Sequence, residues 1–513
     1  MRLYRQSASL LSGSHNWQRI RACQASLVQI RTLIQPSFDY KFIRDNADQL
    51  LENAVNRNVH NAQPHRVGKL YDEYRALVTE TNTHRSMLND VSKKMAAKAK
   101  ARKNTCDFQN EMTKLREQAI KSKQAIQDIK ERLHKVEESL RYEAAKIPNL
   151  SHPDTPVGDE SKARVICVNG NLHTIGTVPL DGIGTKLSDT EFQDHYDLAL
   201  KLGIVDMEAG AKVAGSRFHY WRGAGALLEL ALVQYAMTRA VAAGFTPHIT
   251  PDAARSSIID ACGFRPRSHS EEERLCSGEK QPGEASQIYR MSPVAEESSG
   301  EEHAADPLCL VATAEIPLVA MKQKQILENT LLPMRLAGLS HCFRAEAGAR
   351  GRDTRGIYRL HQFTKVELVT LAHPENSENE LSRLVDFQKS LFADLGLTFR
   401  VLQMPTFELG ASAYQKFDIE AWMPGRKSWG EISSASNCTD YQARRLGIRV
   451  RTNDSGSNST MFVHTLNATA VAVPRLVVAL LESFQRPNGH VVIPAVLRPW
   501  MMGIETLVPP SYK

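Results

Sequence analysis

The chain has 513 residues, of which 42% are hydrophobic, 24% charged and 7% aromatic. This ordinary globular composition excludes collagen-like, intrinsically disordered and disulfide-dense proteins, and the length suggests about two to four domains. Lys and Arg number 64 against 57 Asp and Glu, which gives a formal charge of +7. So small an excess permits an anionic partner without requiring one, and its distribution matters more than its size.

The N-terminal segment has an unusual composition. Its first 38 residues contain five Arg and six Ser but no acidic residue and no Lys. This composition is typical of a mitochondrial transit peptide, so we expect residues 1–35 to direct the protein to the mitochondrial matrix. A disordered basic tail is the alternative.

No uninterrupted apolar stretch reaches the roughly 20 residues that span a bilayer, so we expect no membrane contact. The eight cysteines include no C-x-x-C pair, which disfavours a zinc site or a disulfide framework.

Apolar residues recur at spacings of three and four along residues 67–145. The series from Phe108 to Leu140 follows a heptad seam, and a more polar series runs from Val67 to Met95. Residues 101–107 between them have the composition of a turn. The sequence therefore predicts a helical hairpin at about 67–145, within an N-terminal domain at 36–148. Each helix would reach roughly 50 Å.

Positive charge gathers in this hairpin. Residues 91–135 contain 13 Lys or Arg and 5 Asp or Glu, a net charge of +8 that exceeds the charge of the whole chain. Cations along a hairpin tip can neutralise the phosphates of a nucleic acid. A coiled-coil scaffold, a dimer zipper and a solvated lysine face remain alternatives.

A second domain is expected at 149–513. Pro148 ends the arm, and the following residues, 149–158, form a linker rich in turn residues. One polar insert, at about 265–306, is predicted to be a partly disordered surface loop with residues 287–290 ordered inside it.

Four segments of this domain place charged residues among β-like apolar runs: 312–317, 343–367, 430–437 and 466–482. The second predicts a β-hairpin whose Arg- and Gly-rich loop can hold phosphate. Taken alone, its Arg-x-Glu pattern fits structural ion pairs equally well, because alternate residues of a strand share a face. No Gly-x-x-x-x-Gly-Lys or Gly-x-Gly-x-x-Gly sequence is present, which disfavours nucleotide binding by those loops.

Together these segments resemble the seryl-tRNA synthetases, and among them the mitochondrial branch. FRAEAG with RGIYRLHQFTKVE is similar to motif 2 of class II synthetases, LNATAVAVPRLVVALLE to motif 3, and the helix at 227–244 to motif 1. TAEIPL, FDIEAWMPGR and EISSASNCTDYQARRLGIR match further. The resemblance implies an α+β fold, with a class II antiparallel β-sheet catalytic domain flanked by helices and an N-terminal antiparallel coiled-coil arm before it.

The resemblance also implies the partners. The arm would bind mitochondrial serine tRNAs, and the motif 1 helix would form a homodimer interface, for which a plain buried core helix is the alternative. Ala468 stands where many relatives outside mitochondria have glycine, which we interpret as a marker of the branch. The residues expected to contact tRNA are Lys93, Lys94, Lys98, Lys100, Arg102 and Lys103.

The implied activity is that of a serine–tRNA ligase, which forms seryl-adenylate from L-serine and ATP with Mg²⁺ and then esterifies the 3′ end of tRNA. L-serine would be bound by Thr313, Ala314, Glu315, Arg344, Glu367, Asn467 and Thr469. ATP would be bound by Arg344, Ala345, Glu346, Leu360, Phe363, Glu431, Ile432, Ser433, Ser434 and Arg475. Mg²⁺ would be held by Glu431 and Ser434.

These residue types suit the reaction, because the carboxylate of serine is already an ionised nucleophile. Activation then needs orientation and charge neutralisation, which two arginines and a carboxylate-bound Mg²⁺ can supply. The rival hypothesis is a synthetase-like protein without catalysis, which should have lost residues of the pocket. In this sequence all the residues that the resemblance assigns to the pocket are present. A third possibility, a synthetase shared between the mitochondrion and the cytosol, would have the same activity and differ only in location.

Overall fold

The computed structural model describes residues 36–100, 106–170, 192–264, 288–291, 306–346, 356–452 and 459–510. Four predicted features fall wholly or mainly outside these ranges: the transit peptide, Arg102 with Lys103, most of the insert at 265–306, and most of the Arg- and Gly-rich loop within 343–367. Residues 36–513 form one compact unit.

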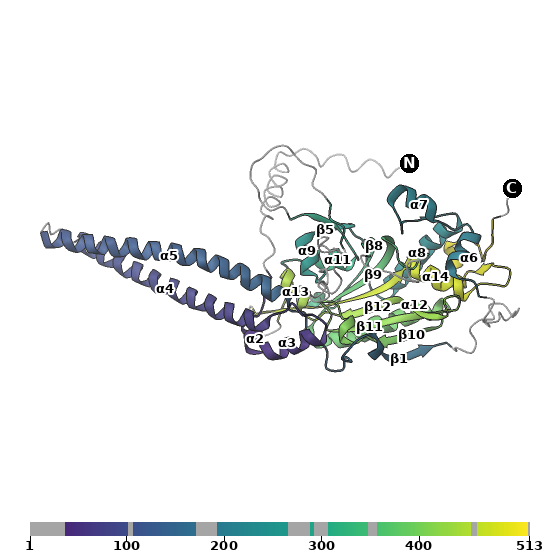
Figure 1. The fold of residues 1–513 in the computed structure, drawn as a ribbon, viewed down its shortest axis with the longest axis horizontal. Coiled ribbons are helices and arrows are strands. Elements are labelled where there is room, and N and C mark those ends of the chain that lie inside the picture. Colours follow the sequence, from purple (N-terminus) through teal and green to yellow (C-terminus); the bar gives the residue numbers. More distant parts are fainter. Residues whose placement is uncertain are drawn as a thin grey trace, which may run out of the picture. The chain divides into compact units, whose positions relative to one another are not determined.

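Two long antiparallel helices, α4 (Pro64–Lys100) and α5 (Cys106–Lys146), form the arm (Figure 1). Two short helices precede them, α2 (Tyr40–Asp45) and α3 (Ala47–Asn56). Every seam position from 67 to 95 and from 108 to 140 is buried or half-buried, as the heptad spacing predicts. Leu77 of α4 packs with Ile129 and Val136 of α5. The predicted helical arm is therefore confirmed.

Arg57 is one of the residues that join the base of the arm to the rest of the unit, together with Asn149, whose amide donates to the carbonyls of Ser412 and Cys438. Arg57, only 3% exposed, donates hydrogen bonds to the carbonyls of Asn149, Leu150 and Ala413 at 2.7, 3.2 and 2.9 Å. It also donates to the carbonyl of Gly410. A guanidinium carries five donors in a fixed plane, so Arg57 can hold the linker after the arm and the loop at 410–413 at the same time.

An eight-stranded sheet forms the second part of the unit, with strand order β1-β10-β11-β12-β15-β9-β8-β4. Its pairs are antiparallel except for β4 with β8, which is parallel. The predicted antiparallel sheet is thus confirmed. The strands are β1 (Arg164–Asn169), β4 (Thr246–Ile249), β8 (Met334–Phe343), β9 (Gln362–Ala372), β10 (Phe399–Gln403), β11 (Gln415–Met423), β12 (Ser428–Asn437) and β15 (His464–Ala472).

The two faces of this sheet differ in chemistry. One face carries apolar side chains such as Val366, Ile419 and Ala468, which belong to a single large core. The helices α8 (Ala224–Ala242), α12 (Ser377–Asp394) and α14 (Val473–Ser483) contribute to that core and pack on the strands. The other face presents charged and hydroxyl side chains, and it forms the candidate site.

Shorter elements complete the described chain. The small strands are β2 (Val205–Asp206), β3 (Tyr220–Trp221), β5 (Ala253–Arg255), β6 (Leu308–Leu310), β7 (Ile326–Leu327), β13 (Arg449–Arg451), β14 (Thr460–Phe462), β16 (Val491–Val492) and β17 (Thr506–Leu507). The remaining described α-helices are α6 (His195–Lys201), α7 (Met207–Ala214), α9 (Ser256–Ala261), α11 (Glu315–Ala320) and α13 (Tyr441–Leu446). Among the described helices, none combines the length and apolar character needed to cross a bilayer.

We predict that Arg57→Ala destabilises the protein by about 3 kcal/mol, because it leaves several carbonyls at the base of the arm without their charged donor. Urea unfolding measures the loss. Lys212→Ala serves as the control, since Lys212 forms an exposed ion pair with Glu208 that contributes at most about 0.5 kcal/mol. Equal stabilities of the two variants would contradict this role of Arg57.

Candidate active site

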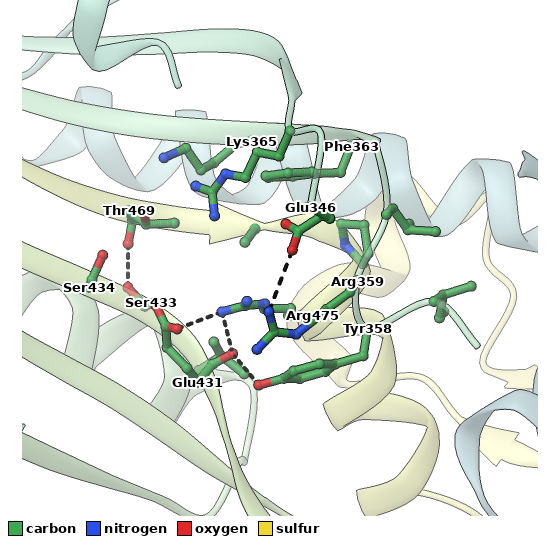
Figure 2. A pocket seen from close by; sticks show the side chains of 16 residues that line it. Glu346, Tyr358, Arg359, Phe363, Lys365, Glu431, Ser433, Ser434, Thr469 and Arg475 are labelled. Atoms are coloured by element: carbon green, nitrogen blue, oxygen red, sulfur yellow. Dashed lines mark hydrogen bonds and ion pairs between the residues drawn. The ribbon is translucent and has the colours of Figure 1, made fainter. Parts of the chain in front are cut away.

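A cleft enclosing about 580 Å³, partly open to solvent, lies on the polar face of the sheet (Figure 2). The cleft is lined by Arg344, Glu346, Ile357, Tyr358, Arg359, Leu360, Phe363, Lys365, Glu431, Ile432, Ser433, Ser434, Thr469, Ala472, Pro474 and Arg475.

Strand β9 supplies a row of side chains to this face. Phe363, Lys365 and Glu367 are alternate residues of an extended strand, so they point the same way. Arg344 follows β8, the neighbouring strand, and its guanidinium carbon lies 5.2 Å from the centre of the Phe363 ring. A cation and an aromatic face therefore stand side by side at one end of the row, with a carboxylate at the other end. Such an end-to-end separation suits a ligand with distinct aromatic and polar parts.

Strand β12 supplies a second row through a bulge. Its register with β11 shifts by one residue: Asp418 is paired with Ser434, but Glu420, two residues on, is paired with Glu431, three residues away from Ser434. Without the extra residue, side chains three positions apart would point to opposite faces. The bulge instead brings the Glu431 carboxylate and the Ser434 hydroxyl to the same face.

Ion pairing controls the charge of Glu431. Its carboxylate lies 2.8 Å from a guanidinium nitrogen of Arg475. Burial acts to raise the pKa of Glu431, but Arg475 and Lys416 outweigh it and hold that pKa well below its usual range. The Tyr358 ring lies under the Arg475 guanidinium, 4.8 Å from its carbon, and the Tyr358 hydroxyl donates to the Glu431 carbonyl at 3.3 Å. Arg475 is thereby held in place from two sides.

Glu315 begins helix α11 on the polar face, beside the carboxylate end of the β9 row. Gly338 of β8 permits this close approach, because a Cβ at that position would lie 2.8 Å from Leu318 and 3.2 Å from Ala314. The amide of Gln442 donates to Glu315 at 2.7 Å. Burial, followed by repulsion from Glu367, raises the pKa of Glu315 to about 7.

Glu367 is the buried carboxylate that lies beside Glu315, and its side chain is 2% exposed. Its Oε2 atom lies 2.5 Å from Lys365 Nζ and accepts the Thr469 hydroxyl at 3.2 Å. The register of β15 with β9 places Thr469 directly opposite Glu367, which explains the hydrogen bond.

The structure divides the predicted site residues into two groups. Those expected to bind ATP line the cleft, except for Ala345. Of those expected to bind serine, Arg344 and Thr469 line the cleft, whereas five lie beyond its lining: Thr313, Ala314, Glu315, Glu367 and Asn467. Asn467 lowers the pKa of Glu315 and so acts on the same cluster, while its amide contacts Cys438 Sγ at 3.6 Å. The Ser433 hydroxyl instead donates to the Thr469 carbonyl at 2.6 Å, so its side chain supports the strands.

Several lining residues were not predicted from the sequence. Lys365 is the most prominent, and strand alternation with Glu367 was the signal that could have found it. Tyr358 and Arg359 lie in the connection before β9, where no periodicity marks the direction of a side chain.

Outside the cleft, Asp194, His195 and Glu482 offer ligand atoms within 4.8 Å of one another. Hydrogen bonds already engage both carboxylates and the Nδ1 atom of His195. The Glu482 carboxylate accepts one hydrogen bond from His195 Nδ1 at 3.1 Å and another from the Arg426 backbone amide at 3.0 Å. The imidazole lies against Gly356, where a Cβ would come within 2.5 Å of Nε2. The cluster therefore supports the segment that enters the cleft.

Comparison with known proteins identifies the family. Residues 38–151 match the seryl-tRNA synthetase N-terminal domain, and residues 297–484 match the class II tRNA synthetase core domain (G, H, P, S and T). A serine–tRNA ligase of Treponema denticola is 39% identical over 464 residues, which cover 90% of this chain and 98% of that protein. The mitochondrial serine–tRNA ligase of Schizosaccharomyces pombe is 38% identical over 479 residues, which cover 92% and 90%.

Solved structures agree with this assignment. The seryl-tRNA synthetase of Pyrococcus horikoshii complexed with ATP superposes with a TM-score of 0.75 at 31% identity, covering 92% of this chain and all of that one (100%). The cytoplasmic serine–tRNA ligase of Naegleria fowleri in complex with AMP gives 0.71 at 26% identity, covering 93% and 99%. The chain belongs to the seryl-tRNA synthetase family and is an ATP-dependent serine–tRNA ligase of class II.

Proposed function

We propose that this ligase acts in the mitochondrial matrix, where it activates L-serine with ATP and esterifies mitochondrial serine tRNAs. The observation that carries the reaction is the row along β9, because Phe363 and Glu367 separate an aromatic site from a carboxylate site on one face. The acid-free, Arg-rich segment at 1–35 supports the location. A mitochondrial relative at 38% identity is consistent with it.

ATP lies in the cleft under this proposal. Phe363 stacks on adenine, while Glu346 and the backbone near Ala345 and Leu360 contact its edge. Ile432 and Ser433 form the wall through strand β12. Arg475 binds the distal phosphates, and its contacts with Glu431 and Tyr358 support this role because they fix the guanidinium in advance.

L-serine lies at the other end of the row. Its ammonium binds Glu315, with Thr313 and Ala314 beside it, and its hydroxyl binds Glu367 and Thr469, supported by Asn467. Arg344 bridges the serine carboxylate and the α-phosphate, and its position in the lining of the cleft beside Phe363 supports the phosphate contact. The carboxylate attacks the α-phosphorus without a general base, so catalysis consists of bringing two anions together and neutralising their charge.

Glu431 and Ser434 fit a Mg²⁺ ion, because the bulge in β12 places an ionised carboxylate and a hydroxyl on one face. Hard cations prefer such oxygen donors. Bound there, Mg²⁺ would neutralise phosphate charge. The Glu431 carboxylate itself keeps a negative charge beside Arg475 at neutral pH, because its pKa lies well below the usual range.

The two domains divide the work in this proposal: residues 36–148 bind tRNA and residues 149–513 catalyse. Lys93, Lys94 and Lys100 are exposed on α4, which supports contacts with phosphate. The proposal extends to Lys98, Arg102 and Lys103. A homodimer through α8 and β4 is supported by apolar side chains at that surface, including Leu230 at 61% and Ile249 at 86% exposure.

The Arg344→Ala variant tests the site. Loss of this guanidinium should lower serine-dependent ATP–pyrophosphate exchange at least about 100-fold, because it removes a preorganised charge from the developing transition state. Binding of tRNA, measured by filter binding, should persist. Arg451→Ala, which removes an exposed ion pair with Glu328, should retain exchange. Exchange unchanged in Arg344→Ala would exclude the proposed phosphate contact.

The Lys94→Glu variant tests the arm. Reversing this exposed charge should weaken tRNA binding and lower the slope of log affinity against log salt by about 1. Pyrophosphate exchange should be unaffected. Lys69→Glu makes the same change at the base of the arm and should leave tRNA binding intact. Identical salt slopes in both variants would favour a scaffold.

Location is tested with the N-terminal segment. Replacing its five arginines by Gln should abolish uptake by isolated mitochondria, since import signals need positive charge. Replacing five of the six serines by Ala leaves the charge unchanged and should permit uptake. Uptake of the arginine-free protein would contradict the proposal.

A further inference from the structure

Lys365 occupies the middle of the β9 row, between the proposed ATP and serine sites. Its side chain is 7% exposed, and its ammonium pairs with the buried Glu367 carboxylate at 2.5 Å. A buried ion pair is costly to desolvate and is often no more stabilising than a pair of apolar residues. Its presence in a binding cleft therefore calls for a role beyond stability.

The pair controls the orientation of Glu367. Lys365 and Thr469 both contact the same carboxylate oxygen, Oε2, at 2.5 and 3.2 Å. Two donors on one oxygen fix the rotation of the carboxylate, and Oε1 is then the oxygen left for the hydroxyl of a bound serine. Because Lys365 comes from the same strand and Thr469 from the neighbouring one, strand pairing holds both donors in register.

Lys365 also acts electrostatically on Glu315, so the charge of one ammonium influences two buried carboxylates. Glu367 raises the pKa of Glu315, whereas Lys365 lowers it. The cluster is one positive charge short of balance when both carboxylates are ionised, and an α-ammonium group supplies that charge. The groups coupled electrostatically or by hydrogen bonds to Glu315 are Glu367 and Lys365 on β9, Asn467 on β15, Gln442 on α13, Cys262 after α9 and Cys438 after β12.

We propose that Lys365 is a positioning residue for serine recognition, which orients Glu367 toward the substrate hydroxyl and leaves Glu315 to pair with the substrate ammonium. This inference rests on the proposed serine site. Lys365 acts through the two carboxylates and therefore governs binding of serine rather than of ATP.

The test compares Lys365→Met with the wild-type enzyme in serine-dependent ATP–pyrophosphate exchange. KM for serine should rise at least about 10-fold, while kcat and KM for ATP change less than about twofold. The pH midpoint of kcat/KM for serine should move up by about one unit, since removal of a nearby cation raises the pKa of a carboxyl group. A merely structural role would not move that midpoint.

Two further variants keep the test decisive. Arg335→Met removes another inward-facing ion pair, that of Arg335 with Glu380, and should leave KM for serine and the midpoint unchanged. Lys365→Gln retains an N–H donor for Glu367 but no charge. It should recover part of the KM and keep the shifted midpoint, and it carries the test if Lys365→Met does not fold.

The outcomes separate this inference from the proposed function. Wild-type KM for serine and an unshifted midpoint in the folded Lys365 variants would overturn the inference alone. An equal rise of KM for serine and for ATP would overturn it as well. A wild-type enzyme without serine-dependent exchange would instead contradict the proposed serine site.

Discussion

Pairing of charges on the polar face of the sheet is the constraint on which the site depends. A charged side chain in a partly dry environment is stable only when an opposite charge or several hydrogen bonds accompany it. The ammonium of Lys365 meets Glu367, and the guanidinium of Arg475 meets Glu431. Each pair therefore has a fixed geometry before any ligand arrives, which is what electrostatic preorganisation requires.

Packing on the opposite face makes this geometry rigid. The helices α8, α12 and α14 bury apolar side chains from most strands, so the strands cannot slide without losing a large core. Gln388 of α12 reaches through to the carbonyls of Ser434 and Thr469 at 2.8 and 2.9 Å. These bonds tie β12 to β15 where each contributes a functional residue. The apolar face thus fixes the positions of groups on the polar face.

Features created by interactions between residues close in sequence could be predicted from the sequence, whereas features created by contacts between distant segments could not. The arm was predictable because its seam repeats locally, and Leu77 and Val136 are buried where the heptad places them. Glu431 and Ser434 were not predictable from strand periodicity, because strict alternation would send them to opposite faces. The bulge that unites them depends on pairing with β11, and their assignment came from family resemblance.

Strand alternation in the sequence could have predicted one further residue of the site. Lys365 precedes Glu367 by two residues in a segment expected to be a strand, so a shared face followed from the pattern. Glu315 could be named from the TAEIPL match, but its proximity to Glu367 depends on Gly338 and on the packing of α11 against β8. Sequence spacing carries no information about that distance.

The two ends of the site differ in how their charge responds to pH. At the phosphate end, Arg475 and Lys416 keep the pKa of Glu431 well below its usual range, so its charge is constant near neutrality. At the serine end, burial and Glu367 raise the pKa of Glu315 to about 7. A cationic partner depresses a carboxyl pKa, whereas an anionic one raises it. Below about pH 7 Glu315 gains a proton and loses attraction for an ammonium group, so acid should weaken serine binding before it affects the phosphate end.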